Sequence, residues 1–319
     1  MSRVGKRIKS YWKMIVASFN AFMDDRGLKI SGALAYFSIF SMAPLLMIII
    51  FIMGSLYGAG DLQGKIFNEM NGVVGEDAAT QIQESMKRIS LAEKTSISLV
   101  TGIVTLFIGA TGVFIEIQDS INMIWRVKAK PQKGWLQMIK NRFLSFSLII
   151  SLGFLLLVSL IINGVVVALM DQLKTYIPDI TVVLLNGINL IITFVIITIL
   201  FSIIFKFLPD AEINWRDVRK GAIFTAILFM LGRYLIGLYI SFAEPGTPFG
   251  AAGSIIVVLV WVYYTAAILY FGAEFTQVYA EACGGKIRPA SYAVHLVLHE
   301  EEEDVDELPP QGHEVDKLE

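Results

Sequence analysis

The hydrophobic residues of this chain are gathered into long blocks, and short polar segments separate the blocks. Each block is long enough to cross a hydrocarbon core about 30 Å thick as an α-helix. A single water-soluble core would bury all of them and leave little amphipathic surface to face water. The pattern therefore predicts an all-α, polytopic integral membrane protein. Its six predicted transmembrane spans cover residues 30–57, 97–117, 143–170, 180–207, 221–242 and 251–279.

Composition agrees with this pattern. The chain has 319 residues, of which 55% are hydrophobic and 17% charged, whereas a soluble domain is about 45–50% apolar and about 25% charged. We divide the chain into a cytoplasmic segment (1–29), a six-helix transmembrane domain (30–280) and a cytoplasmic tail (281–319). The tail is acidic and rich in polar residues, so it is predicted to be disordered.

The first segment is predicted to be an amphipathic helix with a basic face. Its apolar residues recur at helical spacing, and lysines and arginines occupy the other positions. This pattern is typical of a helix that lies on an anionic membrane surface. The alternative is a cytoplasmic helix packed on the rest of the protein. Short amphipathic helices are also predicted in the first external loop, residues 58–96.

Prolines and glycines mark a kink and a turn. Pro44 lies in the middle of the first span, where it removes a backbone hydrogen bond and kinks the helix. The segment 244–250 holds two prolines and two glycines. It predicts a tight antiparallel hairpin of the fifth and sixth spans. Pro44 and Gly250 are therefore candidate gating positions.

Lysine and arginine residues predict the orientation. With the N-terminus inside, the predicted inner segments contain twenty of these residues and the predicted outer loops contain five. Because short cytoplasmic loops carry an excess of Lys and Arg, both ends are predicted to lie in the cytoplasm.

Arg233 is a charged residue inside the fifth predicted span. An isolated Arg near the bilayer centre costs at least about 2.5–3.5 kcal/mol on insertion scales, so it needs a partner or a wet cavity. One interpretation is contact with an anionic group of a lipid or substrate. The other is a structural role, by snorkelling or by pairing with carbonyls and Glu244.

Three further polar residues are candidates for a substrate-binding group with Arg233. Glu116 closes the second predicted span, Glu274 lies near the inner end of the sixth, and Asn122 follows the second span. The two glutamates are predicted to lie at the cytoplasmic interface, too far on the inner side to reach Arg233. They are interpreted either as ordinary interfacial carboxylates, paired with Arg126, Lys128 or Lys29, or as a polar cluster at the mouth of a cavity.

Several chemistries have no matching motif. The sequence carries no phosphate-binding GxxxxGK[ST] loop and no HExxH zinc motif. Its three histidines all lie in the tail, so no Ser–His or Cys–His pair can be placed in the membrane domain. The basic residues are explained by membrane orientation. We therefore expect no cofactor, no metal site, no nucleic-acid partner and no enzymatic activity.

Four motifs, in order, resemble the YihY/BrkB family of bacterial inner-membrane proteins. The first span carries AYFSIFSMAPL at residues 35–45, and the second ends in IQDSINMIW at residues 117–125. Leu208-Pro209 and Trp215 precede the fifth span, and Phe249-Gly250 follows it. Trp261, Tyr263 and Gly272-Ala273-Glu274 lie in the sixth. Met42-Ala43 and Phe249 depart from the usual residues, and the acidic tail is outside the pattern.

The resemblance implies six helices with both ends in the cytoplasm, in the inner membrane of a bacterium. It links the chain to envelope processes and to export of lipid or lipopolysaccharide precursors, whereas an old ribonuclease label for the family is regarded as a mistake. Two hypotheses of function follow. The first is a transporter, exporter or flippase of an anionic amphiphile, with membrane lipids or a lipopolysaccharide precursor as partner and Glu116 or Glu274 as proton carrier. The second is a non-transporting scaffold or envelope assembly factor.

Overall fold

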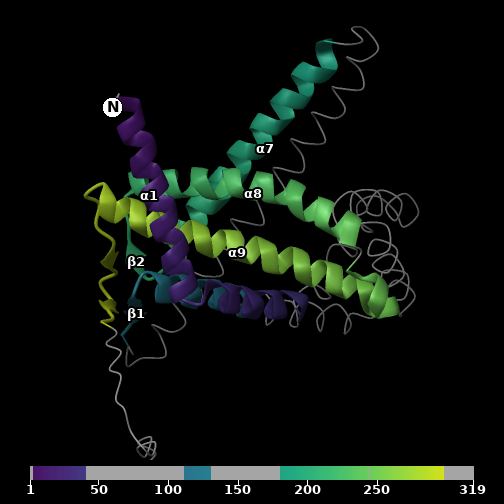
Figure 1. Cartoon of the computed structure of the whole chain (residues 1–319). Coiled ribbons are helices and arrows are strands. Elements are labelled where there is room, and N and C mark those ends of the chain that lie inside the picture. Colours follow the sequence, from purple (N-terminus) through teal and green to yellow (C-terminus); the bar gives the residue numbers. More distant parts are fainter. Residues whose placement is uncertain (1–2, 41–110, 131–179, 244, 298–319) are drawn as a thin grey trace, which may run out of the picture.

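A computed structural model describes residues 3–40, 111–130, 180–243 and 245–297 of the chain. Pro44, the first external loop and the third predicted span lie outside these residues. In the described part, long helices dominate, with four short strands at one end of the molecule (Figure 1). The expected all-α class is therefore right in its main feature.

The N-terminal region consists of two helices that meet at a steep angle (Figure 1). Helix α1 spans Arg3–Asp24, and a second helix covers Gly27–Phe40. The break between them includes Arg26, whose φ of 55° lies in the left-handed region. Gly27 is required here because the Phe22 ring occupies the space that a Cβ would need. The second helix thus begins slightly earlier than the first predicted span.

The helix that contains Glu116 is described over residues 111–124. It continues past residue 117, the predicted end of the second span. Arg126 follows with a φ of 54°, and strand β1, Val127–Ala129, comes directly after.

Three further helices complete the described bundle. Helix α7 spans Ile180–Phe207, as predicted for the fourth span. It ends just before Leu208-Pro209 because a proline disfavours the α conformation in the residue that precedes it. Helix α8 spans Trp215–Ala243 and begins six residues before the predicted 221. After a 3₁₀ turn, Thr247–Ala252, helix α9 spans Gly253–Ala282. Gly250 lies in that turn.

Helices α8 and α9 pack side by side and antiparallel (Figure 1), since Gly221 faces Thr276 at one end and Gly232 faces Ile268 toward the other. The predicted hairpin of the last two spans is therefore confirmed. Helix α7 contacts α8 at an oblique angle, and α1 crosses α9. Stretches of three of these helices are long and apolar enough to cross a membrane: Leu190–Phe207, Trp215–Ala243 and Ile255–Ala282.

Two small antiparallel ladders join segments that are far apart in the sequence. Strand β1 pairs with β4, Ala293–His295, and strand β2, Ala211–Glu212, pairs with β3, Arg288–Pro289. The prediction of a disordered tail from residue 281 was wrong for residues 281–297, because α9 continues to Ala282 and backbone pairing orders the polar segment that follows.

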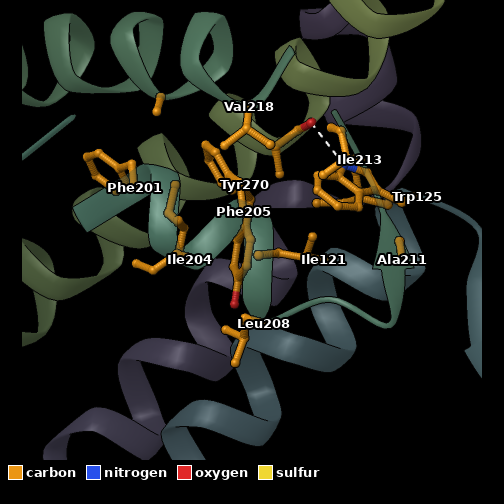
Figure 2. Close-up of a cluster of buried hydrophobic side chains, with 14 of the residues drawn as sticks. Ile121, Trp125, Phe201, Ile204, Phe205, Leu208, Ala211, Ile213, Val218 and Tyr270 are labelled. Carbon is orange, nitrogen blue, oxygen red and sulfur yellow. Dashed lines mark hydrogen bonds between the residues drawn. The ribbon is translucent and has the colours of Figure 1, made fainter. Parts of the chain in front are cut away.

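The largest buried cluster lies next to these ladders. Phe205, Ile121, Val218 and Tyr270 are each essentially inaccessible to solvent and come from four different helices (Figure 2). Trp125 joins the cluster, and its Nε1 donates to the Ala273 carbonyl oxygen at 3.1 Å. The cluster holds the ends of the helices together at the strand-bearing end.

Candidate functional site

The first candidate site is a cavity of about 510 Å³ between α7 and α8. Its walls are mostly apolar, and its volume is typical of sites for small molecules. Among the described residues that line it, Arg233 carries the only charge. The lining residues are Leu190, Thr193, Ile197, Phe229, Met230, Arg233, Tyr234, Gly237 and Leu238.

Arg233 lies near the middle of α8, about 6 Å past the helix midpoint at about 1.5 Å per residue. Its side chain is exposed, and no salt bridge joins it to another described residue. Tyr234 and Leu231 beside it are also exposed, at 69% and 59%. Glu244, the proposed structural partner, is outside the described residues. The cavity thus offers one cation in an otherwise apolar surface.

A second polar site lies at the strand-bearing end and centres on Asp210. Asn122 Nδ2 donates to Asp210 Oδ2 at 2.7 Å, and the Asp210 amide donates back to Asn122 Oδ1 at 2.8 Å. Gln118 Nε2 donates to Asp210 Oδ1 at 3.0 Å, and the Ala290 amide donates to the Asp210 carbonyl oxygen at 3.0 Å. Asp210 therefore connects the helix of residues 111–124, the end of α7 and the tail.

Asp210 also perturbs two titratable neighbours. Burial raises the pKa of Tyr292 to about 12, with added contributions from the charge of Asp210 and a hydrogen bond to it. Partial burial raises the pKa of Asp119, and the negative charge of Asp210 raises it further. The Asp210 carboxylate thus accepts hydrogen bonds from Asn122, Gln118 and the neutral phenol of Tyr292. This arrangement is well suited to hold the structure together.

Glu274 belongs to a third polar group, beside the ion pair of Asp25 and Arg126. Arg126 Nη2 donates to Asp25 Oδ1 at 2.5 Å, and both residues interact with Glu274. Glu274 is 2% exposed, and its Oε1 has no hydrogen-bond partner among the described residues. Arg126 therefore forms its ion pair with Asp25, and its charge acts on Glu274 without a direct contact.

The predicted binding residues divide between these places. Asn122 belongs to the Asp210 site, Glu274 lies beside Asp25, and Glu116 lies beside Asp119 and Ser120. From the packing of Gly221 on Thr276, Glu274 lies level with residue 223, about 15 Å along α8 from Arg233. The structure thus separates Arg233 from the other three residues.

Sequence reasoning missed Asp210, Gln118 and the contact of Asp25 with Glu274. One signal was available. Gln118 and Asn122 are four residues apart, and such spacing places two amide side chains on one helix face. The sequence did not indicate which acid they would bind, because Asp210 is 88 residues from Asn122.

Long apolar helices with exposed apolar faces, and an arginine in an apolar cavity, define a helical membrane protein. The chain belongs to the family described as Virulence factor BrkB, whose model matches residues 18–294. This confirms the resemblance found in the sequence motifs.

Curated relatives named UPF0761 membrane protein are similar to the chain over most of its length. That of Pseudoalteromonas atlantica (strain T6c / ATCC BAA-1087) is 27% identical, over 88% of this chain and 87% of the relative. Those of Azotobacter vinelandii (strain DJ / ATCC BAA-1303) and Pseudomonas aeruginosa (strain LESB58) are 26% and 29% identical over 83% and 79% of this chain. The matches cover 62% and 59% of these last two relatives, so the chain spans about three fifths of their length. No solved structure matches the chain.

Proposed function

We propose that this protein is a transporter or flippase of an anionic, lipid-like amphiphile in the inner membrane of a bacterium. The observation that carries the proposal is Arg233, exposed in an apolar cavity between α7 and α8. A guanidinium there offers two or more donors to a phosphate or carboxylate, and the walls suit an acyl chain. The cost of placing an Arg in the apolar layer is explained if it binds such a group.

The proposal includes six spans with both ends in the cytoplasm. Lysine and arginine counts favour this topology. The two strand ladders, the packing of α1 on α9 and the Asp25–Arg126 pair also support it. These contacts join the described parts of the four segments that the topology assigns to the cytoplasm, at one end of the bundle (Figure 1).

Cys283 provides a direct test of the side on which this end lies. It is the single cysteine of the chain and is exposed. A membrane-impermeant maleimide should label it in inverted vesicles but not in intact spheroplasts, and Cys283→Ala should abolish the labelling. Equal labelling of spheroplasts would reject the proposed orientation.

Transport is tested by reconstitution in liposomes that contain fluorescent phosphatidylglycerol, with fluorescent phosphatidylcholine as the neutral lipid. Dithionite bleaching then measures how fast each lipid crosses. We expect Arg233→Ala to slow the anionic lipid about tenfold or more, because about 1.4 kcal/mol of a charge-assisted contact is lost. Arg219→Ala is the matched control, since Arg219 is exposed at the start of α8. Wild-type rates equal to those of empty liposomes would reject transport.

We also propose that Glu274 carries the coupling proton, with Glu116 as the alternative. Glu274 is buried beside Asp25 and Arg126 and has an oxygen without a described partner. In liposomes with a pH gradient, Glu274→Gln should keep lipid movement but lose its dependence on the gradient. Retained dependence in both Glu274→Gln and Glu116→Gln would reject this role.

Two other functions, an envelope assembly factor and a ribonuclease, can be tested separately. If liposomes show no transport, crosslinking in cells should recover a recurrent envelope partner, as expected for an assembly factor. Incubation of the purified protein with RNA, with and without divalent metal, checks the proposal that the chain is not a ribonuclease.

A further inference from the structure

Helix α1 has one face that is already occupied. Met14, Ser18 and Phe22 are buried at 7%, 0% and 5% exposure, and they follow each other at intervals of four residues. The Phe22 ring contacts the Phe271 ring edge-on at 5.9 Å between centroids. The inner face of α1 is therefore packed on α9, as the alternative interpretation of this segment predicted.

The same helix carries a second apolar stripe on its outer face. Trp12, Val16 and Met23 are exposed at 65%, 42% and 48%, whereas the neighbouring Phe19 ring contacts Phe271 of α9 edge-on at 6.4 Å between centroids. The spacings of four and seven residues place Trp12, Val16 and Met23 on one side of a helix. Val16 lies about 200° around the helix from Met14, at about 100° per residue. A helix that only packs on a protein core needs one such stripe, so the second requires a separate explanation.

Position decides what this outer stripe meets. The inner face contacts α9 through Phe271 and Phe275, in the C-terminal half of a membrane-spanning helix. Helix α1 crosses α9 rather than running along it (Figure 1). A helix that lies across the side of a span near its end is parallel to the membrane surface. Its outer stripe then points sideways, at the depth of the interface.

Charge indicates the kind of surface. Lys9 and Lys13 are exposed and border the outer stripe. Arg3, Lys6 and Arg7 precede them, and the first acidic residue of the helix is Asp24. Basic residues next to an apolar stripe favour anionic lipid headgroups, and a Trp ring is well placed at a membrane interface.

We infer that α1 is a two-faced interfacial helix, whose outer stripe of Trp12, Val16 and Met23 docks into the anionic cytoplasmic leaflet beside α9. This surface does not depend on the transport function. It would hold α1 and the adjoining Asp25 at a set depth against α9 in a scaffold as well as in a transporter.

The test uses the full chain in nanodiscs, with nitroxide labels on cysteines in a Cys283→Ala background. Trp12→Cys and Val16→Cys report on the outer stripe, and Ala17→Cys is the matched control because Ala17 is exposed on the same helix away from the stripe. With phosphatidylglycerol present, labels at 12 and 16 should collide with oxygen dissolved in the bilayer and lose collisions with an aqueous nickel reagent. The label at 17 should remain accessible to water.

The charge of α1 is then changed while the label stays at residue 16. Replacing both lysines, Lys9→Gln and Lys13→Gln, should raise aqueous collisions at Val16→Cys, by roughly fivefold per charge if docking is electrostatically limited. Equal aqueous access at 12, 16 and 17 would overturn the proposal. Dipolar coupling between labels on two copies, unchanged by lipid composition, would also overturn it and assign the stripe to a second copy of the chain. Size-exclusion profiles matching the unlabelled protein establish that each variant is folded.

Discussion

Thr276 on α9 packs directly against Gly221 on α8, and the relationship is reciprocal: Thr225 on α8 packs against Gly272 on α9. Each threonine hydroxyl donates to the carbonyl oxygen of the glycine four residues before it, at 2.8 Å for Thr225 and 2.7 Å for Thr276. Small residues at intervals of four let two helices approach closely in lipid, where apolar burial does not drive association. This paired contact holds the last two helices together.

Enlarging one glycine of this contact should separate the helices. A Cβ on Gly221 would overlap the Thr276 side chain, and one on Gly272 would overlap Thr225. We expect Gly221→Val and Gly272→Val each to cost about 1–3 kcal/mol or more through overpacking. Thermal unfolding in detergent, followed by circular dichroism, measures the loss. Gly187→Val is the control, because no atom of the described residues lies within 4 Å of its new Cβ; equal destabilisation there would contradict the packing argument.

Substitution of Asn122 should lower stability more than substitution of Gln118, the other side-chain amide that donates to the Asp210 carboxylate. Asn122→Leu leaves both the buried carboxylate and the Asp210 amide without this partner, and unpaired buried groups of this kind cost about 1–3 kcal/mol each. Gln118→Leu removes one donor to the same carboxylate. We therefore expect Asn122→Leu to lower the unfolding midpoint further. The reverse order would show that Asn122 is not the principal clamp.

In the Asp25–Arg126 ion pair, loss of Arg126 should destabilise the protein more than loss of the Asp25 charge. Arg126→Ala leaves Asp25 and Glu274 as neighbouring carboxyl groups without their shared cation, whereas Asp25→Asn leaves Arg126 beside Glu274. Breaking a buried pair by removing the partner of a buried charge costs up to about 3–5 kcal/mol. The half-exposed guanidinium reduces this value through solvent screening. Unfolding of both variants and of the double variant measures the coupling, and equal losses would contradict the shared role of Arg126.

The phenol of Tyr292 provides a pH test of the Asp210 site. Burial raises its pKa from 10.0 to about 12 in the folded protein. An unfolded chain ionises this phenol near 10, so its contribution to stability is complete below pH 10 and is lost as pH rises toward 12. The difference in absorbance titration at 295 nm between the wild type and Tyr292→Phe should therefore have its midpoint near 12. A midpoint near 10 would mean that Tyr292 is not buried beside Asp210 in solution.

Much of the fold was predictable because lipid imposes a simple requirement. A helix such as α7 must be long and apolar, so its bounds can be predicted from hydrophobic length alone. The start of α8 was predicted too late, since Trp215, Arg216 and Asp217 are polar or interfacial residues on a helix that extends beyond the apolar layer. The order in the tail was missed because strands of two or three residues carry no periodic signal.

The sequence by itself determined that the chain is a membrane protein, which family it belongs to and where the helix of residues 180–207 lies. Those features depend on local composition and on the order of short motifs. Only the tertiary structure decided that Asn122 binds Asp210, that Glu274 lies beside Asp25 and apart from Arg233, and that α1 has two apolar faces with different environments. These are contacts between residues distant in the chain, and their partners depend on helix crossing and rotation, which a one-dimensional pattern does not specify.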